Sequence, residues 1–250
     1  MDLELSGKTV LVSGGSRGIG RAIVEGFLAE GATVSFCARD PRGVAQAQID
    51  LGERAFGSVV DITDAAGVEA WAKAVAERMG GIDIVVPNVS ALAGGSDLAT
   101  WRHAVETDLL GAVALVNAAL PWLSASSAAA VVLISSVSGR EVDMFAEPYG
   151  VIKSALIHYG KSLSVKLAGQ GIRVNTVSPG NVYFPDGVWG KIERETPETF
   201  AQCLAMNPLG RMARPDEVAK AVLFLASSAA SFTTGTNLTV DGGLTRGVQF

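Results

Sequence analysis

Short apolar runs alternate with longer segments of helical periodicity along the whole chain. The apolar runs are rich in β-branched residues and predict strands over Thr9–Ser13, Thr33–Ala38, Ser58–Val60, Asp83–Pro87, Ala130–Ser135, Arg173–Ser178 and Asn237–Val240. The segments between them predict helices over Gly20–Glu30, Pro41–Leu51, Ala65–Met79, Ala99–Leu123, Tyr149–Ala168 and Pro215–Ala226. Strands this apolar are typical of a parallel sheet that is buried on both faces. We therefore predict an α/β fold with a doubly wound, predominantly parallel seven-stranded sheet and helices on both faces.

The segment from Asn181 to Gly210 interrupts this alternation. It is rich in proline, glycine and aromatic residues, so it predicts a long irregular stretch. Because ligands of such folds bind beyond the carboxyl ends of the strands, we expect residues 181–210 to form a substrate lid there. The alternative is a surface excursion with a short helix. The chain has 250 residues, of which 48% are hydrophobic, which predicts one domain over residues 1–250.

Charge and cysteine content narrow the class of protein. A net charge of −5 and the lack of a basic run argue against nucleic acid or an anionic membrane as a partner. Cys37 and Cys203 do not form a C-x-x-C motif, which argues against a disulfide framework or a metal site. No apolar leader segment is visible, and apolar runs such as Ala130–Ile134 are too short to span a bilayer. We expect a soluble, cytoplasmic protein.

A glycine-rich loop follows the first predicted strand and opens into a helix. It reads S-G-G-S-R-G-I-G, from Ser13 to Gly20. Glycines allow a tight turn and a close approach to a pyrophosphate, which then lies at the positive end of the helix. The order strand, loop, helix is that of a Rossmann-type dinucleotide site, although a glycine-rich packing turn is the alternative. The residues expected to contact the cofactor are Gly14, Ser16, Arg17, Gly18, Ile19 and Gly20.

The end of the second predicted strand bears on which dinucleotide binds. An NAD site usually places a carboxylate there for the ribose hydroxyls, whereas this chain has Ala38 followed by Arg39. Arg39 and Arg17 suit a 2′-phosphate, which guanidinium groups bind by charge-assisted hydrogen bonds. We therefore predict NADP(H). The alternatives are that both arginines are solvated surface residues, or that Asp40 binds the ribose instead.

Tyr149 and Lys153 lie four residues apart in a predicted helix and therefore share a face. Alone, this spacing is more often a packed tyrosine with a lysine that extends to solvent. A free phenol with a pKa near ~10 is a poor base at neutral pH, and a nearby cation favours its phenolate form. Lys153 is placed to supply that cation. Ser136 ends a predicted central strand thirteen residues before Tyr149.

Together these motifs resemble those of the classical short-chain dehydrogenases/reductases, over Gly7 to Gly243. The motifs that carry the resemblance are the glycine loop, V-V-D-I, I-S-S-V-S-G at Ile134–Gly139, Y-G-V-I-K, R-V-N-T-V-S-P-G at Arg173–Gly180, and V-D-G-G at Val240–Gly243. The resemblance implies that Tyr149 is the general acid in reduction and the base in oxidation. It also implies that Ser136 orients the substrate oxygen and that Lys153 binds the nicotinamide ribose. Further cofactor contacts are implied at Asp61, Ile62, Asn88, Pro179, Gly180 and Val182; Asp61 could instead start a helix.

Three positions depart from the family pattern. The usual N-N-A-G reads P-N-V-S, from Pro87 to Ser90, which keeps Asn88 but adds bulk. The usual N-L-x-G reads D-L-L-G, so Asp108 stands where the family has an asparagine that helps to hold a proton-relaying water. Asp108 can accept the same hydrogen bonds, and we include it as a fourth catalytic candidate. Phe184 replaces a threonine expected near the carboxamide, where backbone groups around Val182 could substitute.

The expected substrate edge is apolar and partly aromatic. It consists of Ser138, Leu92, Val142, Met144, Phe145, Phe184, Trp189 and Met206. Such a lining predicts a hydrophobic ketone or secondary alcohol, although the same residues could pack the lid on itself. The alternatives are a 3-oxoacyl-(acyl-carrier-protein) reductase, which the acidic chain disfavours, and a non-catalytic dinucleotide sensor or scaffold. The resemblance implies a homotetramer or homodimer through the two long helices.

Overall fold

A seven-stranded parallel sheet forms the centre of the molecule, and its strand order is β3-β2-β1-β4-β5-β6-β7. The computed structural model describes residues 2–143 and 147–248. The strands are β1 (Thr9–Ser13), β2 (Thr33–Ala38), β3 (Ala55–Val59), β4 (Ile84–Val86), β5 (Ala130–Ile134), β6 (Arg173–Pro179) and β7 (Asn237–Val240). The predicted sheet is confirmed, and the strand boundaries differ from prediction mainly at β3 and β4.

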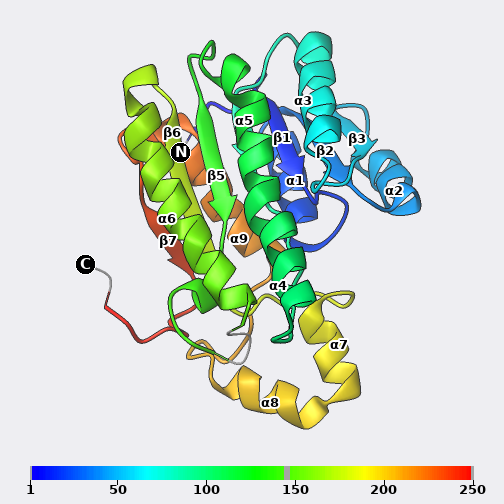
Figure 1. Ribbon diagram of the computed structural model, residues 1–250, viewed down its shortest axis with the longest axis vertical. Helices are drawn as coiled ribbons and strands as arrows, with labels where there is room; N and C mark the ends of the chain where they lie inside the picture. The colour runs from blue at the N-terminus through cyan, green and yellow to red at the C-terminus, as the bar shows by residue number, and fades with distance from the viewer. Residues whose placement is uncertain (1, 144–146, 249–250) are drawn as a thin grey trace.

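Helices cover both faces of this sheet (Figure 1). The α-helices in the described residues are α1 (Gly18–Ala29), α2 (Pro41–Leu51), α3 (Ala65–Met79), α4 (Leu98–Ala104), α5 (Gly111–Leu123), α6 (Tyr149–Leu167), α7 (Val188–Glu195), α8 (Pro197–Ala205) and α9 (Pro215–Ala226), of which α7 and α8 lie outside the layers. Successive residues of each strand alternate between the faces. Val10 and Val12 of β1 therefore join the core under α1, α2 and α9, whereas Leu11 joins the core under α3, α5 and α6. This is the predicted Rossmann-type doubly wound arrangement.

The strand order reverses between β1 and β4, and this reversal positions the site. From β1 the chain proceeds outward through β2 and β3, then returns to β4 on the other side of β1. The connections at the carboxyl ends of β1 and β4 therefore diverge and leave a crevice between them. The loops that follow β1, β4, β5 and β6 all reach this edge of the sheet.

The predicted helix Ala99–Leu123 is not uniform. It consists of α4, a π-helical turn over Val105–Leu110, and α5. A π-helical turn inserts one residue into the repeat and often occurs at functional sites. Here it carries Asp108, which is buried. Periodicity alone did not reveal this turn.

The continuous helical run Leu98–Leu123 has the length and apolar composition of a membrane-spanning helix. It is 26 residues long with a mean hydropathy of 1.3, so by length and composition it could cross a bilayer. The sequence analysis predicted a helix over Ala99–Leu123 but weighed only uninterrupted apolar runs, such as Ala130–Ile134, as possible membrane spans. In the fold, 44% of the apolar window is buried. Leu115, Val116 and Ala119 of α5 pack into the core against the sheet.

The prediction of an irregular segment at 181–210 is wrong, because this segment contains helices α7 and α8. Trp189 of α7, Cys203 of α8 and Met212 form a small buried cluster of their own. The edge of the Phe200 ring packs against Tyr183 with 5.9 Å between ring centroids. In Figure 1 the two helices lie together below the carboxyl edge of the sheet, apart from its main layers.

Candidate functional site

The glycine loop has the backbone geometry that a close-approaching anion requires. Gly14 and Gly18 adopt left-handed φ values of 72° and 58°, and α1 begins at Gly18. A Cβ on Gly20 would lie 2.1 Å from the carbonyl oxygen of Gly14, so only glycine fits there. The side chain of Arg17, at the N-cap of α1, makes no capping hydrogen bond. The first amides of α1 therefore face the crevice edge, where a dinucleotide pyrophosphate fits.

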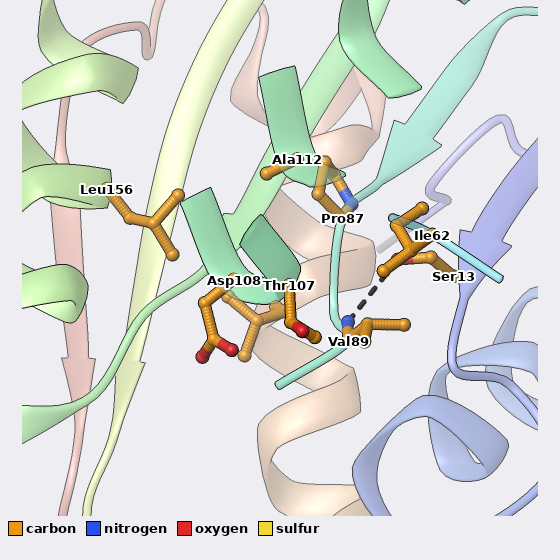
Figure 2. Close-up of a pocket in the computed structure, with 9 residues that line it drawn as sticks. Ser13, Ile62, Pro87, Val89, Thr107, Asp108, Ala112 and Leu156 are labelled. Atoms are coloured by element: carbon orange, nitrogen blue, oxygen red, sulfur yellow. Dashed lines mark hydrogen bonds between the residues drawn. The ribbon is translucent and has the colours of Figure 1, made fainter. Parts of the chain in front are cut away.

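Asn88 holds the neighbouring loop against the glycine loop. Its side-chain Nδ2 donates to the carbonyl oxygen of Ser13 at 3.0 Å, and its backbone N–H donates to Ser13 Oγ at 2.9 Å. The N–H of Val89 also donates to Ser13 Oγ, at 3.3 Å, as Figure 2 shows. The predicted Asn88 therefore joins the loop after β4 to the end of β1, beside the glycine loop.

Phe184 lies against the glycine loop rather than in a separate pocket. A Cβ on Gly18 would lie 2.6 Å from Phe184 Cζ, and a Cβ on Gly187 would lie 2.7 Å from the same atom. Its ring therefore fills the space between the start of α1 and the start of α7. Phe184, which was predicted for substrate contact, thus joins the 181–210 segment to the glycine loop.

The corner expected to hold the adenine ribose is open to solvent. Arg17 and Arg39 are both exposed. Asp40 caps α2 by accepting hydrogen bonds from the N–H groups of Arg42 and Gly43 at 3.2 and 3.1 Å. Asp40 is therefore already engaged at the helix N-terminus, which weakens it as a rival ribose ligand.

Asp61 lies near Arg39 at the same corner. Its Oδ1 accepts from the backbone N–H of Thr63 at 3.0 Å and from the Thr63 hydroxyl at 2.8 Å. The pKa of Asp61 is below its usual value, mainly because the Thr63 N–H donates a hydrogen bond to the carboxylate. The Thr63 hydroxyl and the charges of Arg39 and His103 lower it further, whereas burial acts in the opposite direction. The Asp61 carboxylate thus accepts hydrogen bonds from its own loop, and the adjacent Ile62 is buried.

Ser136 follows the central strand β5 and lies beside Ser138. Ser136 Oγ donates to Ser138 Oγ at 3.2 Å and accepts from the Ser138 N–H at 3.2 Å. Ser138 Oγ in turn donates to Asp143 Oδ2 at 2.6 Å. The two predicted serines therefore belong to one chain of hydrogen bonds that ends on a carboxylate.

Tyr149 and Lys153 occupy the first turns of α6, so the helix start fixes them relative to each other. Lys153 Nζ lies 5.6 Å from the centroid of the Tyr149 ring. The Lys153 side chain is 2% exposed, and its Nζ donates to the carbonyl oxygen of Ile134 at 3.3 Å. A lysine that merely extended to solvent would be exposed. The packing alternative for this pair therefore fails at Lys153.

Asp108 contacts Lys153 directly. Its Oδ2 lies 3.3 Å from Lys153 Nζ, and its side chain is 3% exposed. The hydroxyl of Ser90 donates to Asp108 Oδ2 at 2.5 Å, and the N–H of Ala91 donates to Oδ1 at 2.6 Å. Figure 2 shows Asp108 and Thr107 beside a small pocket that Ser13, Val89 and other apolar side chains complete. Sequence comparison suggested an acceptor for a relaying water, whereas the carboxylate makes an ion pair.

The other two tyrosines are poorly suited to proton transfer at neutral pH. Burial raises the pKa of Tyr159 to about 12. The hydroxyl of Tyr183 donates to Glu193 at 2.5 Å, and this hydrogen bond raises its pKa. A raised pKa disfavours the phenolate that a base must supply. Tyr149 is the tyrosine that lies beside a lysine at the end of β5.

A family profile described as enoyl-(acyl carrier protein) reductase matches residues 14–245. The chain belongs to the short-chain dehydrogenase/reductase family. It is 39% identical to an isoepoxydon dehydrogenase of Aspergillus clavatus, over 99% of this chain and 98% of that protein. It is 35% identical to a cis-4-hydroxycyclohexanecarboxylate dehydrogenase of Sinomonas cyclohexanicum, over 95% of this chain and 96% of that protein.

A solved short-chain oxidoreductase supports the same assignment. It comes from Pseudomonas aeruginosa PAO1 and is described as NADPH-bound with an atypical catalytic center. The two structures match with a TM-score of 0.88 and 33% identity, over 96% of this chain and 98% of that one. The fold and the family of this short-chain dehydrogenase/reductase thus rest on both sequence and structure.

The residues predicted for the substrate edge of this short-chain dehydrogenase/reductase are only partly brought together. Ser138 lies beside Ser136, whereas Trp189 is buried inside the lid cluster, as the packing alternative anticipated. Leu92 is exposed, and so are Val142 and Met206. The predicted Met144 and Phe145 lie outside the described residues.

The residues predicted to contact the cofactor at the end of β6 lie at the carboxyl edge of the sheet. Pro179 ends β6, and the N–H of Gly180 donates to Val240 of β7 at 3.0 Å. A Cβ on Gly180 would lie 2.8 Å from Asp241 Cβ, so glycine is required at this crossing. Val182 is buried and forms a bridge with Ala213.

Sequence reasoning missed Ser90, Ala91 and Asp143 as parts of the site. A usable signal existed for Ser90, because two departures from the family pattern, Ser90 and Asp108, occur in the same chain. Their contact could not be inferred, since they are eighteen residues apart and lie on different elements. Asp143 carried no motif. No cluster of three potential metal ligands occurs within residues 2–143 and 147–248.

Proposed function

We propose that this chain is an NADP(H)-dependent oxidoreductase that interconverts a ketone and a secondary alcohol, with Tyr149 as the general acid and base. The observation that carries the proposal is the position of Lys153. Its ammonium is buried beside the Tyr149 ring and donates to the carbonyl oxygen of Ile134, the last residue of β5. A buried cation at this distance favours the phenolate form of tyrosine, which the reaction needs in the oxidative direction.

The proposed chemistry assigns one role to each side chain. The glycine loop, Asn88 and Lys153 would hold the dinucleotide, which supplies or accepts the hydride when bound. In reduction the Tyr149 hydroxyl gives its proton to the carbonyl oxygen as that oxygen becomes an alcohol. In oxidation the Tyr149 phenolate takes the proton from the alcohol. The Ser136 hydroxyl would hydrogen-bond the same oxygen and stabilise its developing charge.

The proposed preference for NADP(H) rests on the charges at the ribose corner. Arg17 and Arg39 are exposed there, and neutral Ala38 stands where an NAD site usually has a carboxylate. The nearest rival, Asp40, is engaged in capping α2. The related structure described as NADPH-bound adds support from a separate protein.

For the substrate we propose a largely hydrophobic ketone or secondary alcohol. The name of the Sinomonas cyclohexanicum relative describes a secondary alcohol on a six-membered ring. Ring alcohols and ketones are therefore the first members of this class to test. The hydroxyls of Ser136 and Ser138 provide the polar contacts that such a substrate oxygen needs.

The second candidate is reduction of an acyl-carrier-protein substrate, which the description of the matching family profile favours. Carrier proteins present an acidic surface, whereas this chain has a net charge of −5. The segment Ser124–Ala130 carries no basic residue. A non-catalytic sensor would not require Ser136, Tyr149 and Lys153 together, so we rank it third.

The decisive experiment is Tyr149→Phe, assayed with NADPH and a panel of ketones that includes cyclohexanone. We expect kcat/KM to fall by roughly 10²–10⁴-fold, the usual contribution of a general acid, with little change in NADPH binding. Tyr159→Phe is the matched control and should retain activity. Carbonyl-dependent oxidation of NADPH that survives Tyr149→Phe would show that another group donates the proton.

We also propose a cytoplasmic homodimer or homotetramer. Cys37 and Cys203 are buried and do not form a disulfide, which suits a reducing compartment. Val151 and Val165 on α6 and Leu110 beside α5 are exposed apolar residues on the helices expected to form the interface. Sedimentation as a monomer at micromolar concentration would contradict the assembly.

A further inference from the structure

The loop after β4 makes a clamp around the Asp108 carboxylate. The Ser90 hydroxyl donates to Asp108 Oδ2 at 2.5 Å, and the Ala91 N–H donates to Oδ1 at 2.6 Å. We propose that Ser90 is a positioning residue that fixes the Asp108 carboxylate. The Asp108 carboxylate in turn fixes the position of the Lys153 ammonium and partly offsets its positive charge at Tyr149. This inference rests on the proposed function, because it assigns Ser90 a role in the same proton transfer.

The direction of these hydrogen bonds is fixed by chemistry. The Asp108 carboxylate has only acceptor atoms, and each of its oxygens faces a donor from the loop. The Leu92 N–H donates to Ser90 Oγ at 3.1 Å, so the serine proton is directed at Asp108. The short distances to Asp108 are typical of hydrogen bonds to a charged group. The Asp108 side chain is thus contacted by two donors in addition to Lys153.

The backbone of this loop is unusual in a way that supports a positioning role. Leu92 has a φ of 47°, in the left-handed region that a leucine rarely adopts. Such a conformation persists only where surrounding contacts hold it, and strained residues gather at functional sites. Two residues further on, Gly94 forms an antiparallel bridge with Pro148, which precedes Tyr149. The same loop therefore contacts both the partner of Lys153 and the start of the helix that carries Tyr149.

Ser90 and Asp108 compensate for each other. An asparagine at position 108 would offer an NH₂ group, which the Lys153 ammonium cannot use as an acceptor. A residue without a hydroxyl at position 90 would leave Asp108 Oδ2 with the lysine alone in a site that excludes water. A buried carboxylate that loses a hydrogen-bond donor is destabilised strongly. The two residues therefore form one unit, although each departs from the family pattern.

The other groups around Lys153 leave Asp108 as the carboxylate in contact with it. Strand β5 provides the Ile134 carbonyl, which accepts from Lys153 Nζ, and the Ser135 hydroxyl donates to the backbone carbonyl of Lys153. On the α4 side, Glu106 and His103 are exposed, and Asp143 bonds to Ser138. The Asp108 carboxylate thus opposes the effect of the Lys153 ammonium on Tyr149 at short range.

The first test is a double-mutant cycle in thermal unfolding, which needs no substrate. We expect Ser90→Ala to lower Tm by roughly 5 °C in the native chain, because a hydrogen bond to a buried charge is lost. In the Asp108→Asn background we expect Ser90→Ala to change Tm by less than half as much. Ser90→Thr keeps the hydroxyl and should retain most of the stability, and Ser127→Ala at the opposite edge of the sheet is the control. Equal effects of Ser90→Ala in both backgrounds would overturn the proposal.

The second test measures the pH dependence of alcohol oxidation, with NADP⁺ and the alcohol turned over fastest in a panel. We expect Asp108→Asn to move the rising limb of kcat/KM to lower pH, because the Lys153 charge next to Tyr149 is then unopposed. Ser90→Ala should move the rising limb to higher pH by roughly half a unit. The Asp108 carboxylate loses the Ser90 hydrogen bond in this variant and therefore draws Lys153 toward itself and away from Tyr149. Ser90→Ala should have no further effect on the profile when combined with Asp108→Asn.

The outcomes separate this inference from the proposed function. A native pH profile in Ser90→Ala, with Tyr149→Phe inactive, would refute the positioning role and leave the assignment of Tyr149 intact. Turnover that survives Tyr149→Phe would refute the proposed function, and the unfolding cycle would still decide whether Ser90 and Asp108 are coupled. Should Ser90→Ala fail to fold, Ser90→Thr and Ser90→Cys provide the graded series for the same cycle.

Discussion

The two ends of the crevice carry their charges in opposite environments. At the ribose corner Arg17, Arg39 and Asp61 are exposed, and the anion among them bonds mainly to its own loop. At the catalytic end Lys153 and Asp108 are almost completely buried and are held by four further protein groups. Exposed charges interact weakly with each other and remain available to a ligand, whereas buried charges must satisfy each other.

This difference has a functional meaning. The exposed arginines can adapt to a phosphate that arrives from solvent, and salt screens their effect. The buried pair is preorganised, because protein groups hold both side chains in place. Changes at the catalytic end should therefore reduce both stability and turnover. Changes at the ribose corner should alter the choice of cofactor and leave the fold intact.

The largest effect is expected for Lys153→Met. It removes the cation beside Tyr149 and leaves Asp108 buried without its ionic partner, which costs about 3–5 kcal/mol in comparable cases. We expect kcat/KM to fall by roughly a thousandfold and the free energy of unfolding to fall as well. Lys166→Met, at an exposed position of the same helix, is the control. A variant with native stability would mean that the pair is not buried in solution.

Gly20→Ala tests the cradle between the two ends. Its Cβ would lie 2.1 Å from the Gly14 carbonyl oxygen and 2.5 Å from Asn88 Nδ2, so the loop must move. Displacement of this kind costs roughly 1–3 kcal/mol, which predicts about 5- to 150-fold weaker NADPH binding by titration calorimetry. Gly169→Ala has no neighbour within 4 Å of the new Cβ and serves as the control. Unchanged affinity in Gly20→Ala would exclude this loop as the pyrophosphate site.

Arg39→Ala should separate the two cofactors. A lost charge-assisted hydrogen bond predicts roughly tenfold or greater weakening of NADPH binding, with NADH binding little affected. The effect should shrink as salt is raised, because Arg39 is exposed. Arg42→Ala, which is also exposed, is the neighbouring control. Equal losses for NADPH and NADH would show that Arg39 does not contact a 2′-phosphate.

The smallest effect is expected at an exposed cluster far from the chemistry. Glu217 accepts hydrogen bonds from Arg211 and from the Arg214 N–H at the start of α9, and these contacts lower its pKa to about 2. Because the folded-state pKa is below the ordinary value, the stabilisation is present above about pH 4.5 and is lost as the pH falls toward 2. Solvent screening limits it to less than about 1 kcal/mol. Glu217→Gln should therefore lower Tm slightly at pH 7 and by less at pH 3, with Glu53→Gln as the control.

The sequence was most informative where one local pattern determines one structure. Alternating apolar runs predicted the sheet, and the glycine loop predicted the turn into α1, because both depend on residues close together in the chain. The π-helical turn at Val105–Leu110 was missed, since it has the same apolar composition as the α-helices beside it. Helices α7 and α8 were missed because proline, glycine and aromatic residues masked their short periodicity.

The candidate site shows the same limit. The order of Ser136, Tyr149 and Lys153 follows from spacing along β5 and α6, so these residues could be predicted as a group. The ion pair of Lys153 with Asp108 joins separate helices and depends on how the π-helical turn directs one carboxylate. Likewise, the burial of Trp189 depends on two helices that had not been foreseen. Contacts between elements that are distant in the sequence can be identified only once the packing of those elements is known.

The small cluster around Trp189, Cys203 and Met212 would affect how the lid predicted at residues 181–210 works. A lid that is a floppy loop must lose conformational entropy of about 1–2 kcal/mol per residue each time it closes. Helices α7 and α8 have a core of their own, so that ordering occurs once, when the protein folds. A lid built this way would need no further ordering of its own when it closes, and Phe184 against Gly18 marks where the segment contacts the glycine loop.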